Sequence, residues 1–255
     1  MMRFEIKGLK FSYTSAPILE DVSLSIDDSE VMGILGPNGS GKTTLLKCMN
    51  QVLKPMQGSI LYDGKDLLSM ERRDISKIMG YVPQNNISET AFPTVYEVVM
   101  MGRRPYGSWM LNSHDNEIVW VAMEKMGVSA LSARRFDRLS SGQIQRVLMA
   151  RAIAQGAKVL LLDEPTSNLD IRYQIDVMDT VRSLAKNDGN IVCAIIHDLD
   201  LAIKYCDKGA LLYHGKVIAA GDIIDVITPE NIKKVYGVDV IVDKSNYDRP
   251  HVIMP

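Results

Sequence analysis

A short segment near the N-terminal end carries glycines, a lysine and threonines at the spacing of a phosphate-binding loop. Gly36-Pro37-Asn38-Gly39-Ser40-Gly41-Lys42-Thr43-Thr44 matches the pattern G-x-x-x-x-G-K-[ST]. In this pattern backbone N–H groups hold the phosphates, the lysine reaches the β- and γ-phosphates, and the next hydroxyl ligates Mg²⁺. The sequence therefore predicts a nucleoside triphosphate site, with Lys42 and Thr43 in those two roles.

The residues on either side of this loop favour that interpretation over an ordinary glycine turn with a lysine nearby. The apolar run 31–35 precedes the loop and predicts a strand, whereas Leu45, Leu46 and Met49 predict a helix after it. A helix that starts at the loop directs its unpaired N–H groups and its dipole at a bound anion.

Four apolar runs each lead to the loop or to a polar residue of catalytic type. In open parallel sheets ligands bind beyond the carboxyl ends of the strands, so these residues are expected to converge on one site. The runs are 31–35 before the loop, 78–83 before Gln84, 159–162 before Asp163 and Glu164, and 191–196 before His197.

The acids and the histidine have distinct expected roles. A carboxylate at the end of a buried strand is costly unless it meets a cation, so Asp163 is assigned to Mg²⁺. Glu164 is placed to polarise the water that attacks the γ-phosphate, and His197 to contact that phosphate and orient the water. Considered alone, the acids can equally be a solvated strand end, and His197 a capping or hydrogen-bonded residue.

Composition restricts the classes of partner. The 255 residues are 46% hydrophobic with a net charge of −2, so no global field favours nucleic acid or an anionic membrane. The pairs Arg103-Arg104 and Arg134-Arg135 are expected to be solvated. No apolar run approaches the ~20 residues of a membrane span, and no secretion signal is recognised. Cys48 and Cys193 lie in apolar segments, which predicts buried, reduced thiols in a cytosolic protein.

Strand and helix patterns alternate, which predicts an α/β fold with a parallel sheet. Residues 4–13 and the turn near Asp63-Gly64 indicate an antiparallel sheet beside it. The single domain is expected to comprise a nucleotide-binding core with the antiparallel sheet (1–91 and 156–225), an inserted helical lobe (92–155) and a tail (226–255).

The segment Leu139-Ser140-Ser141-Gly142-Gln143 opens a helical pattern, and a serine there is first of all a helix cap. With the loop, Gln84, the acids and His197 in this order, however, the chain resembles the ATP-binding cassette (ABC) ATPases, whose signature reads L-S-G-G-Q. The resemblance covers essentially the whole chain and implies a P-loop NTPase fold.

The resemblance implies that the protein hydrolyses ATP with Mg²⁺. It also implies that two copies pair head to tail, that Ser140 and Gly142 bind the γ-phosphate held by the other subunit, and that Asp170 supports the dimer contact. By the same resemblance Tyr13 is expected to stack on adenine, although a core aromatic remains the alternative. The implied ATP-binding set is Tyr13, Asn38, Gly39, Ser40, Gly41, Lys42, Thr43, Thr44, Ser140, Ser141, Gly142, Gln143 and Asp170; the catalytic residues are Glu164, His197 and Gln84, and the Mg²⁺ set is Thr43, Gln84 and Asp163.

Two positions depart from the signature. Ser141 replaces its first glycine, and a side chain there crowds the nucleotide if the position needs the conformational freedom of glycine. Ile144 stands where the family commonly has a charged or polar residue. Neither change removes a catalytic group, so both bear on rate and affinity.

Residues 93–105, 197–202 and 228–238 resemble importers of iron–siderophore complexes, haem or cobalamin, although 93–105 also fits a plain amphipathic helix. This resemblance implies a peripheral ATPase subunit on the cytoplasmic side of the membrane. It also implies that the lobe contacts a separate permease and that a substrate-binding protein acts indirectly, and Gln84 is expected to be the hinge. The alternatives are a soluble ABC ATPase of DNA repair or translation and a P-loop phosphotransferase.

Overall fold

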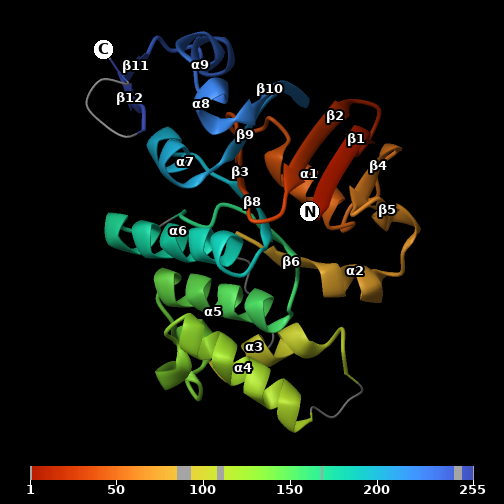
Figure 1. The fold of residues 1–255 in the computed structure, drawn as a ribbon, viewed down its shortest axis with the longest axis vertical. Coiled ribbons are helices and arrows are strands. Elements are labelled where there is room, and N and C mark those ends of the chain that lie inside the picture. Colours follow the sequence, from red (N-terminus) through yellow and green to blue (C-terminus); the bar gives the residue numbers. More distant parts are fainter. Residues whose placement is uncertain (1, 85–92, 108–111, 168, 244–248, 255) are drawn as a thin grey trace. The chain divides into compact units, whose positions relative to one another are not determined.

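The computed structural model describes residues 2–84, 93–107, 112–167, 169–243 and 249–254 (Figure 1). The chain forms two compact units, and each is described by itself. The first unit comprises Met1–Met70 and Met178–Pro255, and the second comprises Glu71–Val177.

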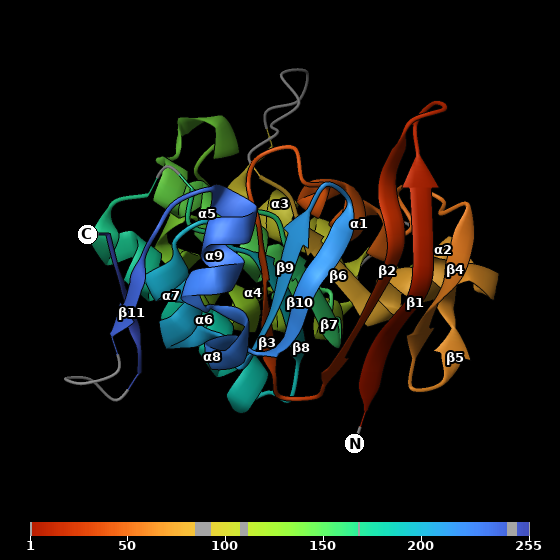
Figure 2. The same ribbon diagram turned by 90° about the horizontal axis from the view of Figure 1, so that it is seen from above.

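The first unit contains the expected antiparallel sheet. Its strand order is β2-β1-β4-β5, and β1, β2 and β4 lie side by side in Figure 2. The β4–β5 turn is at the predicted Asp63-Gly64, where both residues have positive φ (50° and 75°), as the type I′ turn of a two-residue hairpin requires. The strands are β1 (Arg3–Ser12), β2 (Pro17–Asp27), β4 (Gln57–Tyr62) and β5 (Lys65–Asp66).

The same unit contains parallel strands, which confirms the predicted α/β core. Strand β3 (Val31–Leu35) pairs in parallel with both β8 (Ile191–Ile195) and β9 (Lys208–Tyr213). Every residue of β3 and β8 is buried, which explains why their sequences are continuously apolar. Strand β10 (Lys216–Asp222) returns antiparallel beside β9, and helix α1 (Lys42–Met49) follows the phosphate-binding loop.

Helix α7 (Leu199–Tyr205) begins just after His197, and the C-terminal segment is fastened to it. The guanidinium of Arg249 donates to the carbonyls of Ile203 and Cys206, the latter at 3.0 Å. The Val252 N–H donates to the Asp200 carboxylate at 3.0 Å. The remaining elements of this unit are η1 (Leu67–Ser69), α8 (Ile223–Val226), α9 (Pro229–Tyr236), β11 (Ile241–Asp243) and β12 (His251–Ile253).

The second unit combines two parallel strands with a group of helices. Strands β6 and β7 pair in parallel, and α3, α4 and α5 pack on one another (Figure 1), which confirms the helical character expected between residues 92 and 155. Thr94 and Asn112 cap α3 and α4 in capping boxes. The elements are α2 (Arg72–Ile78), β6 (Met79–Val82), α3 (Val95–Met100), η2 (Met101–Arg103), α4 (Ser113–Lys125), η3 (Ser129–Leu131), η4 (Phe136–Arg138), α5 (Ser141–Ala154), β7 (Val159–Leu162) and the start of α6 (Ile171–Lys186).

The prediction that Arg103 is solvated was wrong. Its side chain is buried, and Nε donates to Asp115 at 2.9 Å while Nη1 donates to the Ala154 carbonyl at 2.8 Å. Its guanidinium also lies 4.1 Å from the ring centre of Tyr106. Because η2 turns the side chain toward α4 and the end of α5, Arg103 joins the helices of the second unit. Arg104, the next residue, is exposed as expected.

Arg103→Ala is expected to destabilise the protein by about 3 kcal/mol, because it leaves the buried Asp115 without its cation. Arg104→Ala, at the exposed neighbour, is expected to change the free energy of unfolding by less than about 0.5 kcal/mol. Urea unfolding at pH 7 measures both values. A loss no larger in Arg103→Ala than in Arg104→Ala would show that the pair contributes nothing net.

The same pair predicts a pH dependence. The hydrogen bond that Arg103 donates to Asp115 lowers the pKa of the Asp115 carboxyl below its ordinary value. A depressed carboxyl pKa adds stability above the unfolded-state pKa, and this stability is lost as pH falls through the folded pKa. The free energy of unfolding of wild type is expected to exceed that of Arg103→Ala at neutral pH. This difference should therefore disappear as the pH falls below about 4, which urea unfolding at acidic pH would measure.

The three cysteines, Cys48, Cys193 and Cys206, are free and buried, as expected for the first two. Burial raises the pKa of the Cys48 and Cys193 thiols to about 12, and it raises the pKa of Cys206 as well. Within the described residues, no helix has the length and apolar character needed to cross a membrane.

Candidate nucleotide site

The phosphate-binding loop begins where β3 ends, and its first glycine is sterically required. Gly36 has φ 140°, and a Cβ atom there would lie 2.1 Å from the carbonyl oxygen of Leu212 in β9. A contact this short with backbone excludes any side chain. Gly41, at the other end of the loop, has φ 104° and caps α1.

Lys42 is held inside the loop. Its Nζ donates to the carbonyl oxygens of Gly36 at 2.7 Å and Pro37 at 2.9 Å, and the residue is only 6% exposed. The ammonium group is therefore fixed where the backbone curls around it. A buried cation at the start of a helix creates a local positive potential suited to a phosphate.

Two further observations show that the loop fits a phosphate group. Among the described residues of its first turn, α1 has neither an acidic side chain nor a side chain that caps its N–H groups. The hydroxyl oxygen of Ser40 is buried and, of the polar atoms described, is one of the few without a hydrogen-bond partner. Asn38 and Gly39 are exposed at the tip, and Thr43 and Thr44 are half-buried in the first turn of α1.

His197 lies at the same sheet edge as the loop, as predicted. Strands β3 and β8 are in parallel register, with Ile34 opposite Ile195, and the Ile196 N–H donates to the Ile34 carbonyl at 3.3 Å. The chain therefore passes through Gly36 and through His197 at the same edge of the sheet, beyond the carboxyl ends of β3 and β8. His197 does not cap α7, because Asp198 does so by accepting from the Leu201 N–H at 2.9 Å. The alternative that His197 is simply a hydrogen-bonded residue stays open.

Tyr13 lies just after β1 and its side chain is open to solvent. The residue is 60% exposed, and its ring meets Phe11 edge-on with 4.9 Å between ring centres. The alternative that Tyr13 is a core aromatic was therefore wrong. An exposed ring supported from below by Phe11 is a suitable platform for stacking a base.

In the second unit, Asp163 follows β7 and is almost completely buried. The hydroxyl of Tyr81 in β6 donates to its Oδ2 at 2.9 Å, and its own N–H donates to the Val82 carbonyl at 2.9 Å. Burial, reinforced by the charge of Asp163, raises the pKa of the Tyr81 phenol. Tyr81 was not predicted from the sequence, and its place near the end of the apolar run 78–83 is the one local signal that it carries.

Glu164 and Gln84 are in direct contact. The Gln84 side-chain amide donates to Glu164 Oε2 at 2.6 Å, so the two predicted catalytic residues of this unit are brought together. Glu164 has φ 52°, a left-handed conformation that costs energy for a residue with a side chain. This backbone turn, directly after a buried strand, aims the carboxylate at Gln84.

The signature segment opens helix α5. Ser140 is its N-cap in a capping box with Gln143, with the Gln143 N–H 3.4 Å from the serine oxygen and the Ser140 N–H 3.1 Å from the amide oxygen. The capping interpretation of Ser140 is thus confirmed. Ser141 is the first residue of the helix and is exposed, so this conformation does not need glycine.

The second departure from the signature, Ile144, is buried among the helices of the unit and serves packing. Gly142 lies beside the ring of Tyr173, which a Cβ atom would approach to 3.5 Å, an ordinary contact. Asp170 accepts from the Tyr173 N–H at 3.1 Å and thereby caps α6. Asn168, two residues before Asp170, lies outside the described residues.

The predicted site residues thus divide between the units. Tyr13, the loop and His197 belong to the first, whereas Gln84, the two acids, the signature and Asp170 belong to the second. In the part of the chain that the structure describes, no group of three or more histidine, cysteine or acidic residues could hold a metal ion. The expected Mg²⁺ set, Thr43, Gln84 and Asp163, is instead one hydroxyl, one amide and one carboxylate.

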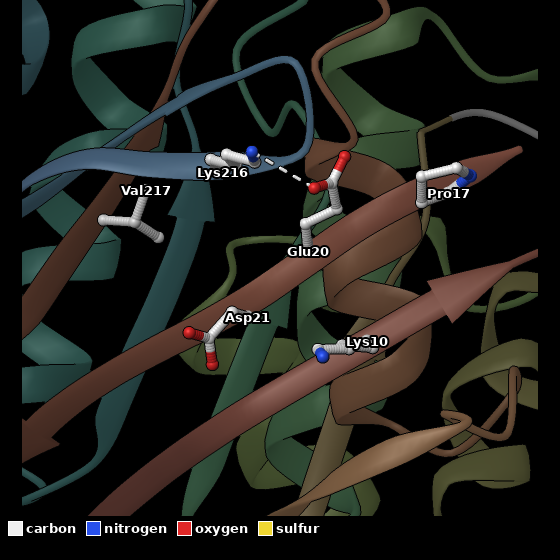
Figure 3. A pocket seen from close by; sticks show the side chains of 6 residues that line it. All are labelled: Lys10, Pro17, Glu20, Asp21, Lys216 and Val217. Atoms are coloured by element: carbon white, nitrogen blue, oxygen red, sulfur yellow. Dashed lines mark ion pairs between the residues drawn. The ribbon is translucent and has the colours of Figure 1, made fainter.

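A hollow of about 550 Å³ on the first unit is lined by other residues (Figure 3). Its lining is mostly charged, and Lys216 pairs with Glu20 at 3.1 Å. None of the residues that line it was predicted to bind nucleotide. They are Lys10, Pro17, Glu20, Asp21, Lys216 and Val217.

Comparison with known proteins identifies related chains. The family model described as ABC transporter matches residues 19–167. An ABC transporter ATP-binding protein of Methanocaldococcus jannaschii is 39% identical over 243 residues, covering 95% of this chain and 94% of that protein. The iron(3+)-hydroxamate import ATP-binding protein of Bacillus subtilis is 36% identical over 253 residues, covering 98% and 94%. The cobalamin import ATP-binding protein of Halobacterium salinarum is 41% identical over 241 residues, which are 94% of this chain and 60% of that protein.

The solved structures that this chain resembles are also those of ABC transporters. A metal-chelate type ABC transporter in an inward-facing conformation has a TM-score of 0.86 and 27% identity, covering 99% of this chain and 96% of that one. An ABC transporter cassette in its ADP conformation has a TM-score of 0.82 and 25% identity, covering 92% and 98%. The chain therefore belongs to the ABC transporter family, as one of its ATP-hydrolysing subunits.

Proposed function

We propose that the protein is the ATPase subunit of an importer for an iron–siderophore complex, haem or cobalamin. The observation that carries the ATPase assignment is the loop, in which Lys42 is held by two carbonyls beside the uncapped start of α1. The importer branch is supported by relatives whose names specify import of cobalamin, iron(3+)-hydroxamate and hemin.

The first unit supplies the binding groups. Lys42 and the N–H groups of the loop hold the β- and γ-phosphates, and Tyr13 stacks on the adenine. His197, which leaves the sheet beside the loop, orients the attacking water. Thr43, Gln84 and Asp163 would hold Mg²⁺, which neutralises charge on the phosphate oxygens when bound.

The second unit supplies the base. Glu164 accepts a proton from the attacking water, whose oxygen forms a bond to the γ-phosphorus while the bond from that phosphorus to the ADP oxygen breaks. In the present structure Gln84 donates to one oxygen of Glu164, so that oxygen is already occupied by a hydrogen bond. Gln84 precedes the helical lobe in sequence, so its release from Glu164 is the step that we assign to coupling with the lobe.

The lobe is where we place the permease contact. Exposed aromatic and aliphatic side chains on it include Tyr106, Trp120 and Val121, and Trp120 is supported by Tyr96 at 5.9 Å between ring centres. A short cytoplasmic helix of a permease would dock on such a surface by the helix-in-groove mode. We infer that two subunits form a head-to-tail dimer and that the protein binds the membrane peripherally through the permease.

The decisive test is co-purification with the membrane protein encoded beside this chain, followed by ATP-driven uptake in proteoliposomes. Cobalamin, hemin and a ferric hydroxamate should be tried separately. Uptake of one of them that stops without ATP is the expected result. Stable association with ribosomes or DNA and with no permease would favour the soluble ABC ATPase instead.

A charge reversal on the lobe should weaken the permease contact. Arg103 is unsuitable because it is buried, whereas Arg104 is exposed. Arg104→Glu is expected to lower affinity for the permease about tenfold, or ~1.4 kcal/mol, while ATP binding by the isolated subunit is unchanged. Lys65→Glu, an exposed reversal in β5 of the first unit, is the matched control and should bind the permease normally. If a pull-down titration gives Arg104→Glu and Lys65→Glu equal affinities for the permease, the permease does not bind at the face that carries Arg104.

A further inference from the structure

We propose that Tyr81 is a positioning residue that fixes the carboxylate of Asp163 for a divalent cation. The proposal rests on the assignment of Asp163 to the Mg²⁺ site. The observation behind it is the 2.9 Å hydrogen bond from the Tyr81 hydroxyl to Asp163 Oδ2. Both residues belong to the second unit, so the contact lies within one compact body.

The backbone makes this contact a product of strand register. Strands β6 and β7 are parallel neighbours, with Tyr81 opposite Leu161 and Val82 opposite Leu162. The Asp163 N–H continues the ladder by donating to Val82. The main chain of Asp163 is thus fixed by Val82 and its side chain by Tyr81, which restricts the carboxylate to one orientation.

The position of Tyr81 is itself secured. The Arg151 guanidinium on α5 donates to the Tyr81 carbonyl at 3.3 Å, and Gly80, beside it, is packed so that a Cβ would lie 3.2 Å from Ala157 and Leu160. The hydroxyl is neutral and has a single proton, which it uses to donate the hydrogen bond to Asp163. A neutral donor leaves the carboxylate its full charge, so Asp163 stays attractive to a cation.

Chemistry explains why such a donor matters. A carboxylate that ligates a metal is commonly held by an outer hydrogen bond, and loss of that partner costs about tenfold to hundredfold in metal affinity. Asp163 is 3% exposed, so solvent offers little to replace the tyrosine. Loss of the Tyr81 hydroxyl would remove one constraint on the carboxylate, so more of its ordering would have to accompany cation binding, and affinity would fall.

The test measures cation binding directly, without turnover. Full-length protein is saturated with the ATP analogue AMP-PNP, and Mn²⁺ affinity is measured by electron paramagnetic resonance. Tyr81→Phe is expected to bind Mn²⁺ about tenfold to hundredfold more weakly than wild type. Its affinity for AMP-PNP in EDTA, measured by calorimetry, is expected to stay within about twofold, because the phosphate loop is untouched.

The matched control is Tyr96→Phe, which removes the hydroxyl that contacts Asn116 in the same unit but away from the acids. It should bind Mn²⁺ as wild type does. Tyr81→Met, which has no donor, should behave like Tyr81→Phe and replaces it if the phenylalanine variant does not fold.

A double-mutant cycle separates the possible failures. Asp163→Asn alone should weaken Mn²⁺ binding, and adding Tyr81→Phe should then change nothing more. A loss from Tyr81→Phe that persists in the Asp163→Asn background would overturn the proposal, because Tyr81 would then act through general folding. Normal Mn²⁺ binding by Tyr81→Phe with weak binding by Asp163→Asn would overturn it but leave the metal assignment intact. Normal Mn²⁺ binding by Asp163→Asn would overturn both the Tyr81 proposal and the assignment of Asp163 to the metal site.

Discussion

Lys42→Ala is expected to abolish ATP hydrolysis and to weaken ATP binding about tenfold to hundredfold. The ammonium is fixed by the carbonyls of Gly36 and Pro37, so it is already ordered when the nucleotide arrives. Its charge-assisted hydrogen bonds to phosphate are worth about 1.5–3 kcal/mol, and the loop N–H groups that remain account for residual binding. Calorimetry gives the affinity and a phosphate-release assay gives the turnover.

Two companion variants sharpen this result. Lys42→Arg should also fail, because the residue is 6% exposed and a planar guanidinium does not fit a seat built for a compact ammonium. Lys47→Ala removes a lysine from the last turn of the same helix and should leave both affinity and turnover near wild type. Unchanged ATP affinity in Lys42→Ala would contradict the phosphate-loop assignment.

Glu164→Gln is expected to reduce turnover about 10²-fold or more while ATP binding persists. The amide keeps the size of the side chain and can still accept a hydrogen bond from Gln84, but it cannot take a proton from water. The left-handed backbone at this position is equally costly for both residues, so the exchange should not alter the turn. Steady-state phosphate release measures the effect, and near-normal turnover would remove the assignment.

The same variant tests assembly. A subunit that binds ATP without hydrolysing it should accumulate as a dimer, because the start of α5 is attracted to the γ-phosphate of the partner's nucleotide. Light scattering of Glu164→Gln is expected to show a dimer with ATP, and a monomer with ADP or without nucleotide. The same mass in all three conditions would count against the sandwich arrangement.

Most of the fold was predictable because buried parallel strands leave a direct trace in the sequence. The runs that became β3 and β8 are apolar at every position, and the turn at Asp63-Gly64 carries residues that tolerate positive φ. Arg103 was misjudged for a related reason. A charge pair in sequence looks solvated, and only the direction of η2 shows that one of the two arginines is buried against Asp115.

The candidate site was predictable as a set of residues but not as a set of contacts. Motif order identified Gln84 and Glu164, whereas their hydrogen bond depends on how far β6 and β7 are displaced along each other. The contact between Tyr81 and Asp163 joins residues 82 positions apart and has no local pattern. Only the place of Ser141 as the first residue of α5 shows that its backbone conformation does not require glycine.

The burial of all three cysteines has a practical consequence for following this protein during its cycle. Thiol-directed dyes react with thiolates, and Cys48, Cys193 and Cys206 are buried with raised pKa values. The three native cysteines are therefore expected to react little with such dyes in the folded protein, so they need not be replaced before labelling. A single cysteine at Met254, which is 81% exposed next to the strand that binds α7, would take up a fluorophore selectively and report on the helix that follows His197.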